Sequence, residues 1–511
     1  MSGYAVAGSA DVFGPARVAL EREIAWLDGV EAGGLGHADL EREMLGRGRE
    51  LQRLLFQAHL EVRAVREVRL GEVTGVDGHP RRWAARGRER DLDSVFGVVN
   101  VERIAYRRRA QSDLHPLDAA LNLPSGQYSY GICEQVARAA ALVSFEHAQV
   151  LVAASTGVTV PRRQLGNLVI DAAGDFEAFY NSSTGDTDTD TDTDTDTDTD
   201  TEEKVLVIQC DGKGVVMRPE ALRLTTAQAP TSRKLATRLS KGEKNGRKRM
   251  AEVAAVYDAT PAPRTAADII TLPAEGERVR AQGPKISDKW LTASVAKDTA
   301  LVIAEAFDQA ERRDPAHTRT WVALVDGNNH QIARIKAEAE ARGIEVTIVV
   351  DFVHVIEYVW GAAWCFFPQG DPKAEAWVGG MMRAVLDGHA SRVAGIIRRK
   401  ATYAELPQAQ RHNADKAADY LLAKAPYLDY PTALTAGWPI ATGVIEGACR
   451  HLIMDRMDIT GARWGLDGAE AVLRLRALTT NGHFDDYWRF HVQQEHQRVH
   501  ANRYLNQTAP T

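Results

Sequence analysis

The hydrophobic and polar positions in the second half of the chain predict an α/β sheet. Continuous apolar runs of strand length alternate there with segments of helical periodicity, and such runs are typical of strands buried on both faces. This alternation favours a sheet covered by helices. The expected strands are 205–211, 251–257, 321–326 and 345–350, and the expected helices are 289–312 and 331–342.

Two of these strands end in the same way. The runs that finish at Asp211 and Asp326 each continue with a glycine. If the strands are parallel neighbours, roughly 4.8 Å apart, the two carboxylates lie side by side at the carboxyl edge, where open α/β sheets bind ligands. Paired carboxylates there suit a divalent metal. Taken alone, each Asp-Gly pair is more typical of a turn.

The N-terminal half has a helical pattern with one predicted hairpin. Apolar residues recur on one face from Ala38 to about Leu70, with possible breaks at Gly46 and Gly48, which favours a packing or dimerising helix. The residues 95–106 predict a β-hairpin. The arginine-dense stretch 79–90 fits a DNA-backbone contact and a solvated loop equally well.

The segment 144–164 has the helix-ending and helix-starting residues that are typical of a helix-turn-helix. One helix is expected to end near Gly157 and a second to start with Thr159 as its cap and Pro161 in its first turn. An ordinary helical hairpin has the same spacing, but the side chains at the start of the second helix favour DNA. These candidate base-reading residues are Arg162, Arg163, Gln164 and Asn167.

Composition and charge narrow the class of protein. The net charge of −7 includes eight aspartates in the Asp-Thr repeat at 186–201, without which the chain carries +1. That repeat predicts a disordered linker. The four cysteines are far apart and argue against a zinc ribbon or a disulfide framework. Neither a membrane span nor a signal peptide is expected, so we expect a cytoplasmic, nucleoid-associated protein.

Basic residues gather between the first two predicted strands. Charge runs are usually solvated surface, but this one lies between two strands of the predicted catalytic sheet, so DNA contact is favoured. The run comprises Arg233, Lys234, Arg238, Lys241, Lys244, Arg247, Lys248 and Arg249.

The C-terminal part returns to a helical pattern. From Val355 to about Tyr430 the chain has helical spacing, which predicts an all-helical insertion into the sheet domain. In the following stretch Glu446, Arg450 and Ile453 are expected to share a helical face. A last helix is expected at 468–479.

Four motifs together resemble the DDE transposases of bacterial insertion sequences, specifically the ISKra type, which is related to Mutator-like transposases. They are Gln209-Cys-Asp211-Gly-Lys-Gly, Val325-Asp326-Gly-Asn-Asn-His, Asp351-Phe-Val-His354, and Val444-Ile-Glu446-Gly-Ala-Cys-Arg followed by Asp455-Arg-Met-Asp-Ile-Thr-Gly-Ala-Arg-Trp464.

The resemblance implies an RNase H-like catalytic domain interrupted by the helical insertion, with Mg²⁺ as cofactor and Mn²⁺ as a substitute. Asp211, Asp326 and Glu446 match the catalytic, metal-binding acids, and Asp351 and His354 match a supporting element. From the residues alone, Glu345, Glu357, Asp455 and Asp258 rival Glu446 as third acid. Arg450, Arg456, Arg463 and Trp464 are candidate DNA contacts. The alternative for Arg456 and Arg463 is a salt bridge to Asp455 or Asp458, and the alternative for Trp464 is packing in the core.

The expected protein is a DNA transposase that cuts transposon ends and joins them to target DNA as a homodimer or higher homo-oligomer. A metal-dependent nuclease without strand transfer and a domesticated, non-catalytic DNA-binding protein are the alternatives. The expected domains are 1–127 (helical with a β-hairpin), 128–185 (helix-turn-helix), 186–203 (linker), 204–355 (catalytic, first part), 356–440 (helical insertion), 441–480 (catalytic helices) and 481–511 (tail).

Overall fold

The computed structural model describes residues 11–182, 204–228, 247–272, 281–459, 461–507 and 509–510. The chain forms two compact units, one of which is assembled from both ends of the chain. Unit 1 comprises Met1–Ser182 and Gly482–Thr511, and unit 2 comprises Ser183–Asn481. The Asp-Thr tract that we expect to be a linker lies outside the described residues.

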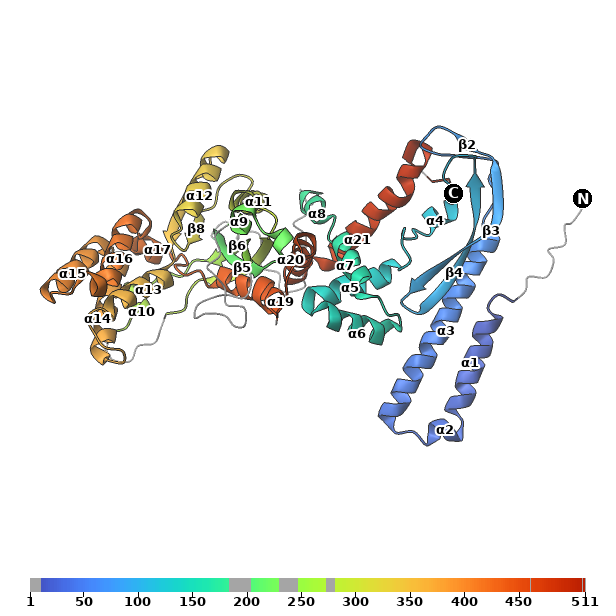
Figure 1. Ribbon diagram of the computed structural model, residues 1–511, viewed down its shortest axis with the longest axis horizontal. Helices are drawn as coiled ribbons and strands as arrows, with labels where there is room; N and C mark the ends of the chain where they lie inside the picture. Colours follow the sequence, from blue (N-terminus) through green and yellow to red (C-terminus); the bar gives the residue numbers. More distant parts are fainter. Residues whose placement is uncertain are drawn as a thin grey trace, which may run out of the picture. The chain divides into compact units, whose positions relative to one another are not determined.

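Unit 1 is mainly helical with a long two-stranded hairpin. Helix α3 runs beside strand β4 and pairs with helix α1, as Figure 1 shows. Its elements are α1 (Gly14–Leu27), α2 (Val30–Gly33), α3 (His37–Arg66), β1 (Val73–Thr74), β2 (Pro80–Arg81), β3 (Trp83–Ser94), β4 (Gly97–Arg107), α4 (Pro116–Ala120), α5 (Tyr130–Leu142), α6 (Phe145–Thr156), α7 (Arg162–Ala172), α8 (Phe176–Ser182), α21 (Phe484–Glu495), the π-helix η6 (His496–His500) and the short 3₁₀ turns η7 (Ala501–Arg503) and η8 (Leu505–Gln507).

Four predictions for unit 1 need correction. Helix α3 continues through Gly46 and Gly48. The arginine-dense stretch forms a strand and not a loop, because Trp83 pairs with Arg107 and Arg90 with Val101 across the hairpin. The hairpin therefore comprises 83–107, and the residues 95–106 that we expect to form both of its strands supply mainly the second one, β4. The C-terminal segment 481–511 is not a tail, since α21 packs against α8 and a buried Asp175 accepts hydrogen bonds from His491 and Arg498 at 2.7 and 2.6 Å.

Unit 2 contains a five-stranded mixed sheet with the strand order β7-β6-β5-β8-β9. Strands β5, β8 and β9 are parallel, and β6 is antiparallel to both of its neighbours. The expected α/β architecture is therefore present. The strands are β5 (Val205–Val216), β6 (Lys248–Thr260), β7 (Lys285–Ser294), β8 (Trp321–Val325) and β9 (Val346–Val350).

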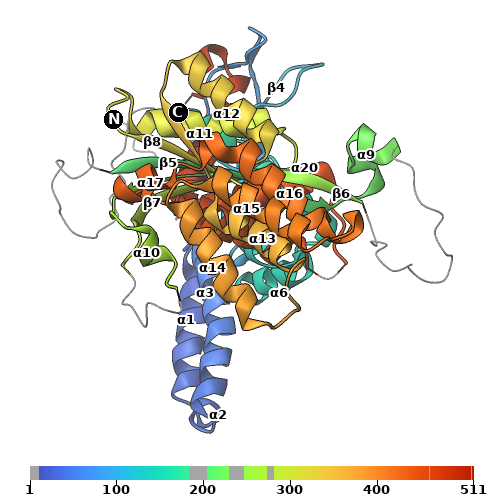
Figure 2. The ribbon, with the colours of Figure 1, turned by 90° about the vertical axis from the view of Figure 1, so that its left-hand side faces the viewer.

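Helices cover the sheet and form a group of their own beside it. Helices α13 to α17 gather beyond the strands (Figures 1 and 2), where the helical insertion is expected, although helix begins already at Phe352. The helical elements are η2 (Pro219–Ala221), α9 (Leu224–Gln228), α10 (Ala266–Ile269), α11 (Thr299–Arg313), α12 (Asn329–Arg342), α13 (Phe352–Ala363), α14 (Pro372–Leu386), α15 (Ala390–Tyr403), α16 (Gln408–Lys424), η4 (Ala425–Tyr427), α17 (Tyr430–Thr435), α18 (Gly443–Ala448), η5 (Cys449–Met454), α19 (Asp455–Met457) and α20 (Leu466–Thr480).

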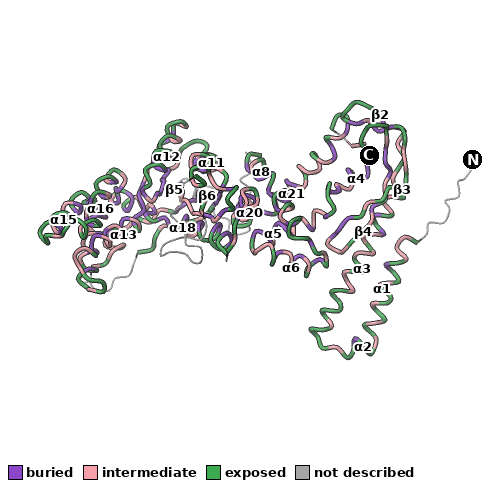
Figure 3. The backbone as a smooth tube through the Cα atoms, in the orientation of Figure 1, coloured by how far each residue is buried: buried purple, intermediate pink, exposed green. Residues whose placement is uncertain are grey.

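The core of unit 2 lies around the central strands, which Figure 3 shows as buried. Every residue of β8 is buried, as are the first six residues of β5. The expected helix 289–312 is wrong in its first part, because residues up to Ser294 belong to β7 and pair with β6. In the described parts of the chain, no helix combines the length and hydropathy that crossing a membrane requires.

Candidate functional site

The parallel register brings the two acids to equivalent positions, although the expected end of the first strand at Asp211 is wrong, because β5 continues to Val216 and keeps Asp211 inside the strand, paired with β6. Leu206 pairs with Trp321 and Gln209 with Leu324, so the same offset places Asp211 opposite Asp326. Because side chains alternate across a strand, Asp211 points to the same face as Gln209. The prediction that these two strands are parallel neighbours is confirmed.

Helix α18 covers this face and is attached to it by a buried glutamine. The Oε1 atom of Gln209 accepts a hydrogen bond from the Ile445 amide at 2.9 Å, and its Nε2 donates to the Tyr257 hydroxyl at 2.6 Å. Gln209 is fully buried. These contacts fix the helix that carries the exposed Glu446 over the strand that carries Asp211.

Cys449 forms a direct link between this helical segment and Asp211. Its thiol donates to Asp211 Oδ2 at 3.3 Å, while Asp211 Oδ1 accepts from the Gly212 amide at 2.6 Å. Burial, followed by the negative charge of Asp211, raises the pKa of the Cys449 thiol, so it remains a protonated donor. Cys449 starts the π-helix η5, a wider helical turn that is often found at functional sites.

The wider turn changes one predicted alignment. Glu446 and Arg450 are exposed, but Ile453 is buried in the core. The expected common face of these three residues is therefore wrong, because a π-helix does not keep the periodicity of an α-helix.

Asp351 connects the third parallel strand to Glu446 through Thr442. The buried Asp351 caps α13 by accepting from the Val353 amide at 3.1 Å, and its Oδ2 accepts from the Thr442 hydroxyl at 2.8 Å. The same Thr442 Oγ1 lies 3.5 Å from Glu446 Oε1. Asp351 is thus engaged in positioning α13 and the start of α18.

The turn after β8 is held by a tyrosine from the helical insertion. The Asn328 amide donates to Asp326 Oδ1 at 2.8 Å, and the Tyr420 hydroxyl donates to the Asp326 carbonyl at 3.0 Å. The Tyr420 ring stacks on Tyr358 with 3.9 Å between centroids, and the His354 ring meets both edge-on. His354 therefore belongs to an aromatic group behind the Asp326 turn.

The carboxylates take these local partners and do not converge closely. Within the residues that the structure describes, no three His, Cys, Asp or Glu side chains lie close enough together to hold a metal ion. Glu252 on β6 is a further acid nearby, and its pKa is raised mainly by burial and also by Asp211.

Two predicted DNA contacts are structural residues instead. Trp464 is buried, and its indole donates to the Met457 carbonyl at 2.9 Å, so it is packed in the core as the structural alternative predicts. Arg456 lies 4.8 Å over that ring. Burial, and then the nearby Arg476, lowers the pKa of Arg456 to about 10, which is the environment of an inward-facing side chain.

The basic residues before and at the start of β6 have different environments. Arg249 donates to the carbonyls of Val295, Ala221 and Ala296, and Arg247 donates to those of Thr226 and Ala227. Both arginines therefore hold loops together. Exposed members of the predicted contact set are Lys248, Arg450 and Arg463, whereas Arg233, Lys234 and Lys244 lie outside the described residues.

The expected helix pair is present in unit 1. Helices α6 and α7 both pack against α5, and Gly157 ends α6 with a left-handed φ of 77°. The second helix begins at Arg162 with Pro161 as its cap, so Thr159 is not the cap. Arg162 pairs with Glu146 at 2.8 Å, Gln164 accepts from the Tyr128 hydroxyl at 2.6 Å, and all four predicted base-reading residues are exposed.

Sequence reasoning missed the residues that connect the acids: Gln209 as a link, Thr442, Cys449 and Tyr420. The sequence contains a sign of the role of Gln209, because a polar residue inside an apolar strand needs a buried hydrogen-bond partner. Tyr420 lies 94 positions from Asp326, and nothing in its local pattern distinguishes it.

Comparisons with known proteins add little. No family model matches the chain, and no curated protein matches it. Among solved structures, the Drosophila P element transposase strand transfer complex is similar over 70% of this chain and 80% of that chain, at 10% sequence identity and a TM-score of 0.21. A likeness of that size carries no argument about this chain.

Proposed function

We propose that the chain is a DNA transposase of the DDE type, with an RNase H-like catalytic domain in unit 2. The observation that carries the proposal is the equivalent placement of Asp211 on β5 and of Asp326 directly after the adjacent parallel strand β8, with the helix of Glu446 attached to β5 through Gln209. The four-motif resemblance to ISKra-type transposases supports the same three acids in the same order.

The chemistry of the donor set suits the expected metal, because carboxylate oxygens are the ligands that Mg²⁺ takes. Within the described residues the acids do not lie close enough together to hold an ion, so Asp211, Asp326 and Glu446 would hold it only after moving toward one another. When bound, the metal supplies activation of a water or a 3′-hydroxyl and stabilises the leaving oxygen of a phosphodiester.

The chain's other residues position this set. Gln209 holds α18, Thr442 lies between Asp351 and Glu446, and Tyr420 fixes the turn of Asp326. Exposed Lys248, Arg450 and Arg463 are the proposed contacts for DNA phosphates. The exposed start of α7 is the proposed reader of terminal repeats.

The test is Mg²⁺-dependent cutting and joining of labelled DNA that carries the element's own ends. Asp326→Asn keeps the size of the side chain and removes its charge, and we expect it to bind DNA but to lose activity by about a hundredfold or more. Asp387→Asn changes an exposed aspartate that directly follows α14 and serves as the matched control.

The products separate the proposed function from its alternatives. Joined strands support a transposase, and cut strands without joining support a nuclease. Binding without any metal-dependent cutting supports a non-catalytic DNA-binding protein. If Asp326→Asn cuts as fast as the wild type, Asp326 is a turn residue and the proposed site is wrong.

A further inference from the structure

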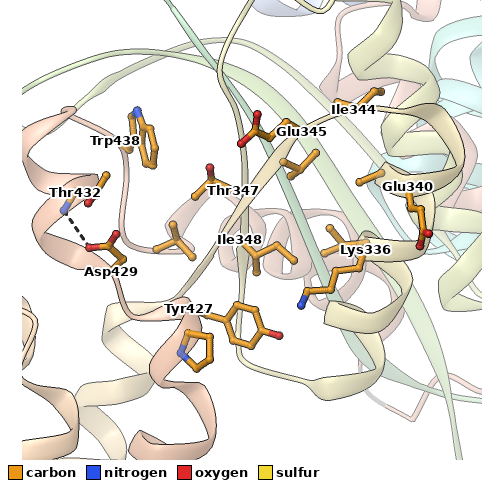
Figure 4. Close-up of a pocket in the computed structure, with 15 residues that line it drawn as sticks. Lys336, Glu340, Ile344, Glu345, Thr347, Ile348, Tyr427, Asp429, Thr432 and Trp438 are labelled. Carbon is orange, nitrogen blue, oxygen red and sulfur yellow. Dashed lines mark hydrogen bonds between the residues drawn. The ribbon is translucent and has the colours of Figure 1, made fainter.

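A cavity lies along the outer edge of the sheet, away from the proposed catalytic acids. It has a volume of about 520 Å³, and β9 passes between α12 on one side and η4, α17 and Trp438 on the other, as Figure 4 shows. Strand β9 is the last strand of the sheet, with β8 as its one paired neighbour. The cavity therefore follows a strand edge.

The hydrogen bonds of β9 show which of its peptide groups face this cavity. The Asp351 amide donates inward to the Val325 carbonyl of the neighbouring chain segment at 2.8 Å. Since peptide groups alternate in direction along a strand, those of Val346, Ile348 and Val350 point outward. The Val350 carbonyl accepts the Tyr430 hydroxyl at 2.8 Å, which agrees with this assignment.

Tyr430 limits the free edge to the first part of the strand. Within the part of the chain that the structure describes, the outward peptide groups of Val346 and Ile348 have no backbone partner, and both residues line the cavity. Ile335 and Ile344 supply apolar walls, and Tyr427 supplies an aromatic one. An exposed strand edge of this kind is a template for another strand.

The rim of the cavity carries an excess of negative charge. Glu340 and Glu345 are exposed and line it, and Asp429, which also lines it, caps α17 through the Thr432 amide at 3.3 Å. Lys336 is the basic residue of the lining, and its ammonium lies 5.0 Å from the centre of the Tyr427 ring. Charge complementarity therefore favours a basic ligand.

We propose that β9 binds a basic, extended peptide segment of a partner protein by strand addition. The peptide's main chain pairs with the outward groups of Val346 and Ile348. Its apolar side chains, at alternate positions, enter the cavity beside Tyr427, and its lysines or arginines face Glu340 and Glu345. This surface is independent of the proposed transposase chemistry.

The test uses the full chain and a labelled peptide of alternating lysine and valine, followed by fluorescence anisotropy. Two further peptides carry N-methyl groups on alternate amides. In one peptide the methyl groups block one hydrogen-bonding edge of the extended strand, and in the other peptide they block the opposite edge. We expect the parent peptide to bind, one methylated form to lose binding, and the other to keep it, because strand addition uses one edge of the peptide.

The site is located by charge reversal on the rim. Surface ion pairs contribute up to about fivefold each, so the double variant Glu340→Lys and Glu345→Lys is expected to weaken binding by about tenfold or more. Glu405→Lys, an exposed acid elsewhere in unit 2, is the matched control and is expected to leave binding unchanged. Peptide binding is also expected to slow hydrogen exchange at the Val346 and Ile348 amides.

Three results would overturn the proposal. Equal binding of both methylated peptides shows attraction by charge without strand pairing. Unchanged binding by the rim variant places the peptide elsewhere. If hydrogen exchange at the Val346 and Ile348 amides is the same with and without saturating peptide, the peptide does not pair with β9. Circular dichroism of the rim variant and of the Glu405→Lys control shows that both are folded.

Discussion

Replacing Gln209 by leucine tests how the Glu446 helix is attached to the sheet. The change keeps the side chain's approximate volume but removes its hydrogen bonds to the Ile445 amide and the Tyr257 hydroxyl. A buried polar group left without a partner costs about 1 to 3 kcal/mol. Two such groups in a fully buried position predict a loss of about 4 kcal/mol in the free energy of unfolding.

The assay is urea denaturation followed by circular dichroism and tryptophan fluorescence, with attention to the transition of unit 2. Gln331→Leu is the control, because Gln331 is also buried, but its Oε1 accepts no hydrogen bond within the described part of the chain. We expect Gln331→Leu to cost much less than Gln209→Leu.

A second measurement separates local from global effects. If Gln209 anchors α18, hydrogen exchange at the Ile445 amide should accelerate more in Gln209→Leu than exchange at the centre of β8. A loss of stability below about 1 kcal/mol, together with unchanged exchange at Ile445, would refute the anchoring role.

Further predictions concern the Asp326 turn and a buried carboxylate. Gly327 has a φ of +90°, and an added Cβ would lie 2.4 Å from the Tyr420 hydroxyl oxygen, so Gly327→Ala should lower the free energy of unfolding by about 2 kcal/mol or more, as measured by urea denaturation. Adding Tyr420→Phe should recover part of that loss, and strict additivity of the two changes would contradict the clash. Asp314 is buried, which raises its pKa, but the hydrogen bonds from Trp321, Arg319 and Thr318 outweigh burial and lower it overall. Its carboxylate therefore stabilises the fold above the pKa of the unfolded chain, and this stability is lost as the pH falls through the lower folded pKa. Asp314→Asn should destabilise most above about pH 5, with the gap to wild type closing on acidification in a series of denaturation curves; a constant gap would show that the charge is irrelevant.

The sheet could be predicted in large part because its central strands are continuous apolar runs. Strands β5, β8 and β9 lie where 205–211, 321–326 and 345–350 predict them, since burial on both faces leaves such runs. Strand β7 was missed because its first half, from Lys285 to Lys289, is polar and largely exposed. Its pairing with β6 overrides the local helical pattern.

Only part of the site could be predicted from the sequence. The register places Asp211 and Asp326 side by side as the apolar runs indicate, although β5 does not end at Asp211 but continues to Val216. The position of Trp464 depends on tertiary packing. The Trp464 amide donates to the Val216 carbonyl at 3.1 Å, and its carbonyl accepts from the Arg218 amide at 2.8 Å, so the segment is tied to the end of β5. No local pattern around residue 464 encodes a partner almost 250 positions away.

The assembly of unit 1 from both ends of the chain has a consequence for biosynthesis. A ribosome makes the α8 surface early, but its cover, α21, emerges only after the whole of unit 2 has been translated. During that interval Phe179 and Asp175 lack Tyr487 and His491, to which they are joined in the finished unit. Nascent chains therefore expose an incomplete core that chaperones can recognise, and a prematurely stopped chain keeps it exposed. Unit 1 can therefore complete its core only after the segment that carries Asp211, Asp326 and Glu446 has been translated.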